Sequence, residues 1–373
     1  MFFRRITPQN MQTPSLPGRY ALTIGAASAL LAGCGGSQPP IGAPGAMPQA
    51  SPLATHADRG KSWMLPEASS EALLYISNTV SRTVSIYSYP SHYLVGTLTG
   101  FTDPEGQCVD AHGDVWITDR ASLVEYAHGG SSPMRTLGIK QGAGALGCSV
   151  APNGDLAVSA AVEDGPSHIR WVILAYKGAS GNPSTYAKSK CTADFLGSPG
   201  YDDQGNLYVE GSHKRQTRGT EIQVGAVCEL PFGGRKLRKV VFGKPGRRGI
   251  NVSSYSSSVM WGGKYLVFGV ILPHTRLYRT KELPGGDLEL VSHTTLRDST
   301  CRYSEEYALN FFLVGTSNAL VNHREAKVVL SGNEDGECSG TTYLNAWRYP
   351  GGGVQKWSLG RGYSLGQSVS FPQ

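Results

Sequence analysis

Cysteine carries the most distinctive side-chain chemistry in this chain of 373 residues, which contains seven of them. The six that follow Cys34 are Cys108, Cys148, Cys191, Cys228, Cys301 and Cys338. An even number of cysteines in a chain with an export signal, described next, predicts disulfides. The sequence has no CxxC or CxxCH motif, which argues against zinc-ribbon, thioredoxin-like and c-type haem sites. It also lacks the Walker A and HExxH motifs that mark nucleotide-binding proteins and metalloproteases.

The stretch Leu31-Ala32-Gly33-Cys34 predicts where the protein is located. It follows a basic leader with Arg4, Arg5 and Arg19 and an apolar run over residues 20–31, the pattern of a secretory signal peptide. The run of about 12 residues is too short to span a bilayer as a helix. The stretch resembles the lipobox of bacterial lipoproteins. This resemblance implies that residues 1–33 are removed, that the Cys34 thiol is diacylated, and that the protein is anchored in the cell envelope, at the outer membrane or cell surface, on its extracytoplasmic side.

Residues 34–70 are expected to contain the lipidated Cys34 and a flexible tether. This segment consists mainly of Gly, Pro, Ala and Ser and has no hydrophobic periodicity. It therefore cannot bury enough apolar area to offset the entropy lost on ordering. The folded domain is expected over residues 71–373.

The charge of the chain argues against nucleic acid as a partner. The formal net charge of +6 falls to +3 once Arg4, Arg5 and Arg19 are removed. One segment, residues 214–248, remains strongly basic. It could form a patch for an anionic polymer or lipid headgroups, or it could be the solvated surface of a hairpin, and we expect the second.

Internal repeats predict the fold. A β-type run that ends in an aromatic residue or Leu, followed by a Pro- and Gly-containing turn, occurs six times, at residues 84–90, 123–130, 172–178, 227–234, 277–286 and 345–352. A second strand–turn–strand unit precedes several copies, at residues 106–119, 147–158, 199–209 and 258–267. Four strands repeated at this spacing predict an all-β, six-bladed β-propeller. Seven blades would require a diverged unit between Arg297 and Lys327.

The first blade is expected to be completed by the end of the chain. The first repeat begins at residues 73–77, which correspond to the second strand of the other blades. The sequence from Gly366 to Ser370 is similar to the Gly-Gln-Cys-Val-Asp strand at residues 106–110. We therefore expect the C-terminal strand to close the ring and remove two exposed sheet edges.

Residues 106–119, GQCVDAHGDVWITD, resemble the repeats of NHL- and YVTN-type bacterial propellers, including propeller lipoproteins. The resemblance implies the fold and says little about function. Gluconolactonase-like propellers hold a metal at the channel mouth with acidic and Asn side chains, and the nearest candidates here are Glu105, Asp110 and Asp202. Asp110 and Asp202 occupy equivalent positions of the repeat, as expected of a structural Asp that bonds its own turn, so we predict no metal site.

A second group of enzymes, the streptogramin-lyase-like propellers, requires a His general base with a Glu. His112 and His128 lie in turns, where histidines are usually spectators. We therefore predict no catalytic residue and no cofactor, and we keep a propeller hydrolase or lyase as the alternative function.

The propeller pattern predicts three disulfides. Cys301 would precede the innermost strand of the last blade, and Cys338 would lie in a loop on the same face, so we expect these two to pair. Cys108 and Cys148 would begin the innermost strands of neighbouring blades and form a second bridge. Cys191 and Cys228 then remain as the third pair.

Aromatic residues suggest where a ligand could bind. Most recur on strands and are expected in the core, but Tyr303, Tyr307 and Tyr363 fall in segments between blades, where propellers build their binding surfaces. The function predicted from the sequence is a lipid-anchored binding or scaffold module for a surface polymer, a protein or a small ligand.

The lipid anchor gives a direct test. We expect the variant Cys34→Ala to lose lipidation and to remain unprocessed or be released from the membrane. Metabolic labelling with a palmitate analogue measures this, and a label on the protein that does not depend on Cys34 would contradict the prediction.

Overall fold

The computed structural model describes residues 60–140, 142–165, 168–187, 191–192, 194–217, 220–243, 258–270, 275–297, 311–315, 325–332, 344–359 and 366–373. All of these belong to one compact unit, Ala57–Gln373. No helix in these ranges is long and apolar enough to cross a membrane.

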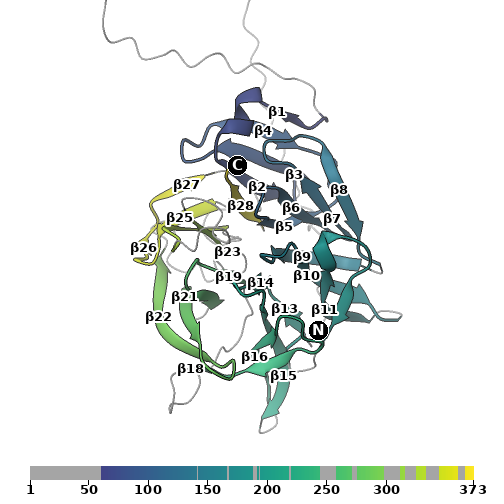
Figure 1. Ribbon diagram of the computed structural model, residues 1–373, viewed down its shortest axis with the longest axis vertical. Helices are drawn as coiled ribbons and strands as arrows, with labels where there is room; N and C mark the ends of the chain where they lie inside the picture. The colour runs from purple at the N-terminus through teal and green to yellow at the C-terminus, as the bar shows by residue number, and fades with distance from the viewer. Residues whose placement is uncertain are drawn as a thin grey trace, which may run out of the picture. The chain divides into compact units, whose positions relative to one another are not determined.

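Six antiparallel sheets form the six blades of a β-propeller, as predicted, with their innermost strands facing a common axis (Figure 1). Blade 1 contains β2 (Leu73–Asn78), β3 (Thr83–Ser88), β4 (Leu94–Leu98) and β28 (Gln367–Ser370). Blade 2 contains β5 (Pro104–Val109), β6 (Val115–Asp119), β7 (Ser122–Tyr126) and β8 (Pro133–Gly138). Blade 3 contains β9 (Gly142–Val150), β10 (Leu156–Glu163), β11 (Ile169–Tyr176) and β12 (Ser184–Tyr186).

The remaining blades are less regular. Blade 4 contains β13 (Phe195–Leu196), β14 (Gly200–Tyr201), β15 (Leu207–Thr217), β16 (Thr220–Leu230) and β17 (Arg238–Val240). Blade 5 contains β19 (Val259–Trp261), β20 (Leu266–Val270), β21 (Arg276–Glu282) and β22 (Leu288–Arg297), and the short strands β18 (Phe242–Gly243) and β26 (Gly353–Val354) add to β22. Blade 6 contains β23 (Phe311–Val314), β24 (Val328–Gly332), β25 (Leu344–Arg348) and β27 (Trp357–Leu359).

The core lies between the blades rather than inside one central layer. Each of six clusters of buried apolar side chains joins two neighbouring blades. Trp116 and Trp347, which the repeats placed on strands, are the largest fully buried side chains. Because each blade is covered on both faces by its neighbours, its strands need apolar residues on both sides.

Both ends of the described chain meet in blade 1. β28 pairs with β2 from Leu73–Ser370 to Ile76–Gln367, which confirms the predicted closure by the C-terminal strand. The short strand β1 (Trp63–Met64) pairs with β4, and a single 3-10 turn, η1 (Pro66–Ser70), follows it. The sequence predicts a flexible tether as far as residue 70, whereas the structure has a strand at Trp63–Met64 and a 3-10 turn at Pro66–Ser70. Their order comes from pairing with the outer edge of blade 1, which composition does not reveal.

Backbone approach between the innermost strands explains a repeated glycine. A Cβ atom on Gly366 would meet the Glu105 carbonyl, and one on Gly106 would meet that of Leu146. Gly200 lies in the same way against Val259. Each of these contacts would be under 3.0 Å, a distance that Cβ atoms do not tolerate. The innermost strands therefore pack against one another directly, with no room for a side chain.

Two disulfides join parts of this ring. One connects Cys108 to Cys148, on the innermost strands β5 and β9 of neighbouring blades, with the Cα atoms 5.5 Å apart. The other connects Cys191 to Cys228. Both pairs are those expected from the sequence. The expected Cys301–Cys338 pair lies outside the described residues.

Buried hydrogen bonds fasten blade 1 to blade 2. Gln107 Nε2 donates to Ser77 Oγ, and Ser368 Oγ donates to Gln107 Oε1, each at 2.7 Å. His128, from blade 2, hydrogen-bonds Ser370 Oγ through Nδ1 at 2.6 Å and donates from Nε2 to the Glu71 carbonyl at 2.9 Å. Burial lowers the pKa of His128, although the Glu71 carbonyl and the Asp114 carboxylate oppose this shift.

The close approach at Gly366 predicts a large effect of one methyl group. We expect Gly366→Ala to lower the free energy of unfolding by at least about 2 kcal/mol, because a backbone carbonyl occupies the space. Gly138→Ala is the matched control, since a Cβ atom on this residue of the exposed strand β8 would meet nothing within 4 Å. Its effect should stay within about 0.5 kcal/mol. Urea unfolding measures both, and equal effects would show that the innermost strands are not packed as described.

His128 predicts a pH-dependent contribution to stability. Because its pKa is lowered in the fold, its contribution is complete above the unfolded value of about 6.5 and is lost as the pH falls. His128→Asn should lower the melting temperature at about pH 7.5, and the gap to the wild type should narrow by about pH 5.5. Calorimetry of the two proteins across this pH range measures the difference between their melting temperatures. The other titrating groups are the same in both proteins, so their contributions cancel. A gap that widens on acidification would contradict the assignment.

Candidate functional site

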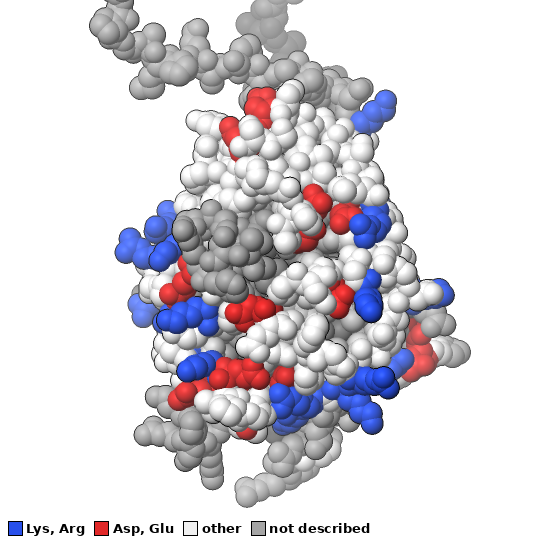
Figure 2. All heavy atoms as spheres, viewed as in Figure 1, with Lys and Arg blue, Asp and Glu red and all other residues white. Residues whose placement is uncertain are grey.

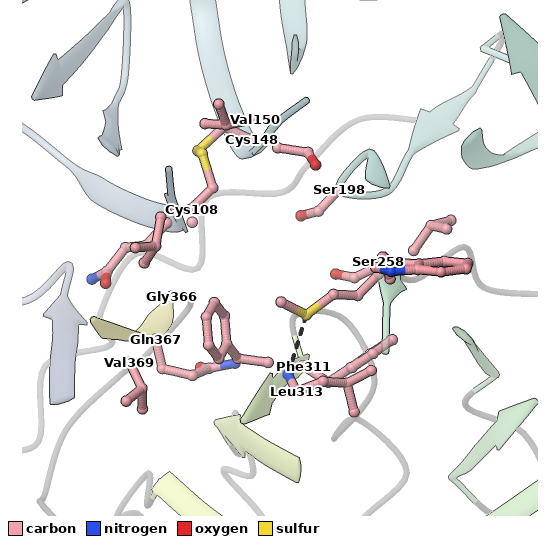
Figure 3. Close-up of a pocket in the computed structure, with 18 of the residues that line it drawn as sticks. Cys108, Cys148, Val150, Ser198, Ser258, Phe311, Leu313, Gly366, Gln367 and Val369 are labelled. Carbon is pink, nitrogen blue, oxygen red and sulfur yellow. Dashed lines mark hydrogen bonds between the residues drawn. A yellow bond between two sulfur atoms is a disulfide. The ribbon is translucent and has the colours of Figure 1, made fainter. Parts of the chain in front are cut away.

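The innermost strands of all six blades surround a cavity of about 90 Å³ on the propeller axis (Figure 3). The apolar part of its wall includes Val150, Met260, Phe312, Val369 and Phe371. The Cys108–Cys148 disulfide also lines it. The position of this cavity follows from the ring, because every blade contributes the edge of its first strand.

Three of the polar or sulfur-containing side chains in the wall are bonded within the fold, whereas the buried Trp261 Nε1 has no hydrogen-bond partner among the described residues. Gln107 is held between Ser77 and Ser368, as described above. Ser149 Oγ accepts the Tyr201 N–H at 3.0 Å, and the Met260 sulfur accepts the Leu313 N–H at 3.1 Å. A ligand in this cavity would therefore meet mainly apolar and sulfur-containing surface.

Cys108 and Cys148 form a disulfide, so Tyr201 is the one side chain that can titrate among the described residues of the wall. Burial raises its pKa, and the neighbouring Asp155 and Tyr186 raise it further. The phenol thus keeps its proton at neutral pH and cannot serve there as a general base.

The acidic residues of the repeat are structural, as predicted from their equivalent positions. Asp110 Oδ1 accepts the backbone N–H groups of His112 and Asp114 at 2.8 and 2.9 Å. Asp202 Oδ1 accepts those of Gln204 and Asn206 at 2.9 and 2.8 Å. Burial raises the pKa of both carboxyl groups, and these hydrogen bonds oppose the shift. Asp110 is in blade 2 and Asp202 is in blade 4, so the fold does not bring them together.

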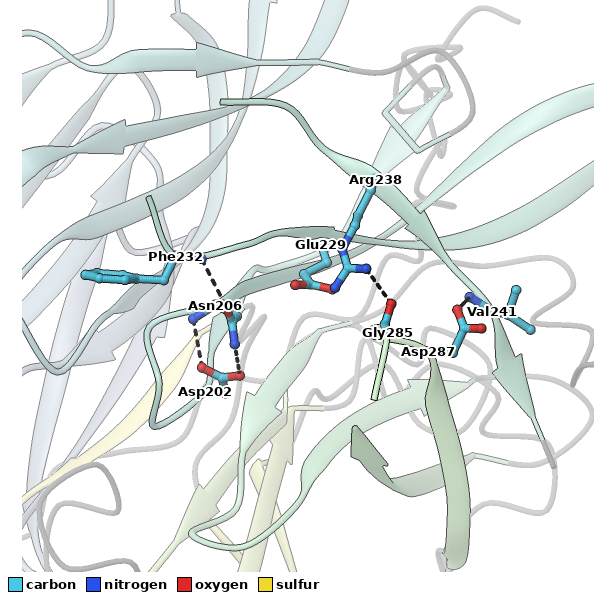
Figure 4. A network of polar contacts seen from close by, with 8 residues as sticks. All are labelled: Asp202, Asn206, Glu229, Phe232, Arg238, Val241, Gly285 and Asp287. Carbon is cyan, nitrogen blue, oxygen red and sulfur yellow. Dashed lines mark hydrogen bonds and ion pairs between the residues drawn. The ribbon is translucent and has the colours of Figure 1, made fainter. Parts of the chain in front are cut away.

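In blades 2, 3 and 4, the Asp or Asn that ends the turn after the first strand accepts a further backbone hydrogen bond. Asp114 Oδ1 accepts the His128 N–H, and Asp155 Oδ1 accepts the Gly178 N–H, at 3.2 and 2.8 Å. In blade 4, Asn206 Oδ1 accepts the Phe232 N–H at 2.9 Å (Figure 4). The side chain ties the turn after the first strand to the turn after the third, which explains why Asp and Asn recur there.

A buried Glu on the third strand pairs with an Arg on the fourth in blades 2 and 4. Glu125 lies 3.1 Å from Arg135, and Glu229 lies 2.6 Å from Arg238. Each Arg also donates to a carbonyl of the next blade, Ala179 for Arg135 and Gly285 for Arg238. The carboxylate oxygens of Asp110, Asp114 and Glu125 lie within 4.8 Å of one another, close enough to hold a cation together. Each of these carboxylates also has a contact within the fold: Asp110 and Asp114 accept backbone N–H groups, and Glu125 pairs with Arg135.

His112, His128 and Glu105, which the sequence also singles out, do not line the cavity. His128 is at the seam between blades 1 and 2, and the exposed turn of His112 accepts a bond from Gln373 through its carbonyl. Glu105 is half-buried on β5. Tyr303, Tyr307 and Tyr363 lie outside the described residues. The apolar wall formed by Met260, Phe312 and Phe371 was not predicted, although the register of the first strands would have pointed to it.

Comparison with known proteins supports the fold alone. No protein-family profile matches the sequence, and no curated protein matches it. A protein of unknown function from Bacteroides caccae is similar in structure, with a TM-score of 0.52 and 11% identity over 81% of this chain and 99% of that one. A functionally unknown protein from Desulfotomaculum acetoxidans aligns with a TM-score of 0.46 and 10% identity, over 81% of this chain and 99% of that one. At 11% identity the likeness to the Bacteroides caccae protein is one of fold alone, and the six sheets show that the chain is a six-bladed β-propeller.

Proposed function

We propose that this protein is a lipid-anchored, extracytoplasmic binding module that holds a small, largely apolar and uncharged ligand in its central cavity. The observation that carries this proposal is the wall itself, which is mainly apolar and in which Gln107, Ser149 and Met260 are bonded within the fold. Two disulfides are consistent with an oxidising compartment. Anchoring through Cys34 rests on the resemblance to the lipobox.

The described wall supports binding over catalysis. General acid–base chemistry needs a group whose pKa lies near the working pH. Tyr201 does not meet this requirement, and the carboxylates of the repeat are used in turns and interblade ion pairs. The cavity volume of about 90 Å³ limits the ligand to a very small molecule, on the order of one aromatic ring, and leaves no room for a folded partner or a polymer.

A small neutral apolar molecule tests the proposal. We expect benzene, which occupies apolar cavities of this order of size, to bind the purified protein at one site in a calorimetric titration. Met260→Trp should weaken binding by about tenfold or more, because the indole would fill the cavity. Met134→Trp is the matched control, since Met134 is 56% exposed on the outer strand of blade 2. Equal binding to both variants, or no saturable binding to the wild type, would contradict the proposal. Thermal melts of both variants verify that each is folded.

A further inference from the structure

A second concave site lies at the rim between blades 3 and 4, away from the axis. It has a volume of about 350 Å³ and is lined by Thr185, Tyr186, Ala187, Arg235, Lys236 and Leu237. The first three come from the outermost strand of blade 3 and its end, and the last three lead into the outermost strand of blade 4. The described lining contains two cations and no carboxylate.

The two cations have no structural role among the described residues. Arg238, three residues further on, is the Arg that this blade uses for its ion pair with Glu229 and its bond to Gly285 (Figure 4). Arg235 and Lys236 are exposed and form no ion pair or hydrogen bond with any residue that the structure describes. Their charges are therefore available to a ligand.

The floor of the groove is packed against the core between blades 3 and 4. Leu237 is 6% exposed and packs in the cluster that contains the Cys191–Cys228 disulfide, and Tyr186 packs against the same cluster. Lys239 is exposed and lies opposite Cys228 in the sheet. Alternation along the strand places Lys239 on the same side as Leu237, beside the groove. Figure 2 shows basic side chains gathered on the viewed face over this part of the ring.

We propose that this groove binds a linear polyanion that carries phosphate or sulfate groups. A single exposed charge pair contributes little because water and salt screen it, so only a ligand with several anionic groups in a row would gain measurable affinity from Arg235, Lys236 and Lys239. Arg and Lys donors, with the Thr185 and Tyr186 hydroxyls beside them, match the acceptor oxygens of phosphate and sulfate esters. A concave rim fits a strand of polymer better than a flat bilayer.

Inorganic polyphosphate is a suitable probe. We expect it to bind the protein, with affinity that falls as NaCl is raised, whereas orthophosphate does not bind measurably. The double variant Arg235→Gln/Lys236→Gln should weaken binding by about tenfold or more. The matched control, Lys140→Gln/Lys281→Gln, removes the same formal charge from exposed positions outside the groove and should change binding less than about twofold.

Three results would overturn this proposal. They are no binding of polyphosphate, equal losses in the groove and control variants, which would indicate the general charge of the protein, and binding to phosphatidylglycerol vesicles with none to polyphosphate. Benzene binding to the groove variant should match the wild type, since the central cavity is untouched. This readout verifies that the variant is folded and separates failure of this site from failure of the proposed function.

Discussion

Direct backbone contact between the innermost strands is the constraint on which the rest of this propeller depends. Gly366, Gly106 and Gly200 each lie against a carbonyl of the next blade, so the strands approach as closely as their backbones allow. This approach sets the small diameter of the central cavity. It also brings Cys108 and Cys148 to a Cα separation of 5.5 Å, within the range that a disulfide needs.

The same constraint explains why many charged and amide side chains of the repeat have structural roles. Strands that converge at the axis diverge toward the rim, and the turns between them must be held in place as they spread. Asp114, Asp155 and Asn206 hold those turns, while Arg135 and Arg238 hold one blade to the next. A carboxylate that is bonded in this way stabilises its blade.

Much of this architecture could be predicted from the sequence because each blade repeats the same local requirements. The Gly at the start of residues 106–119 and of residues 366–370 marks the innermost strand, and in residues 106–119 Asp110 marks the turn that follows. A strand that occurs in one blade only, such as β1, could not be predicted in this way because it is not part of the repeat. β1 has only two residues, and its pairing with β4 is encoded by the outer edge it covers rather than by its own composition.

The candidate site was harder to predict for a related reason. The residues that line the cavity are apolar, and apolar residues in a repeat are expected in the core between blades. Met260 and Phe312 belong to core clusters and to the cavity wall at once, because the innermost strand is the edge of both. The sequence predicts ligand contacts at Tyr303, Tyr307 and Tyr363 instead, and these three residues lie outside the described residues.

The meeting of both ends of the described chain in blade 1 has a mechanical consequence. β1 is held to the outer edge of blade 1 by a pairing of two residues, whereas β28 is inserted at the inner edge and buried. Tension applied through the N-terminal segment would load the peripheral pairing first, and β1 would peel away while the ring stayed closed. The pairing of β1 with β4 would thus yield first under such tension, whereas the pairing of β28 with β2 would keep the propeller closed.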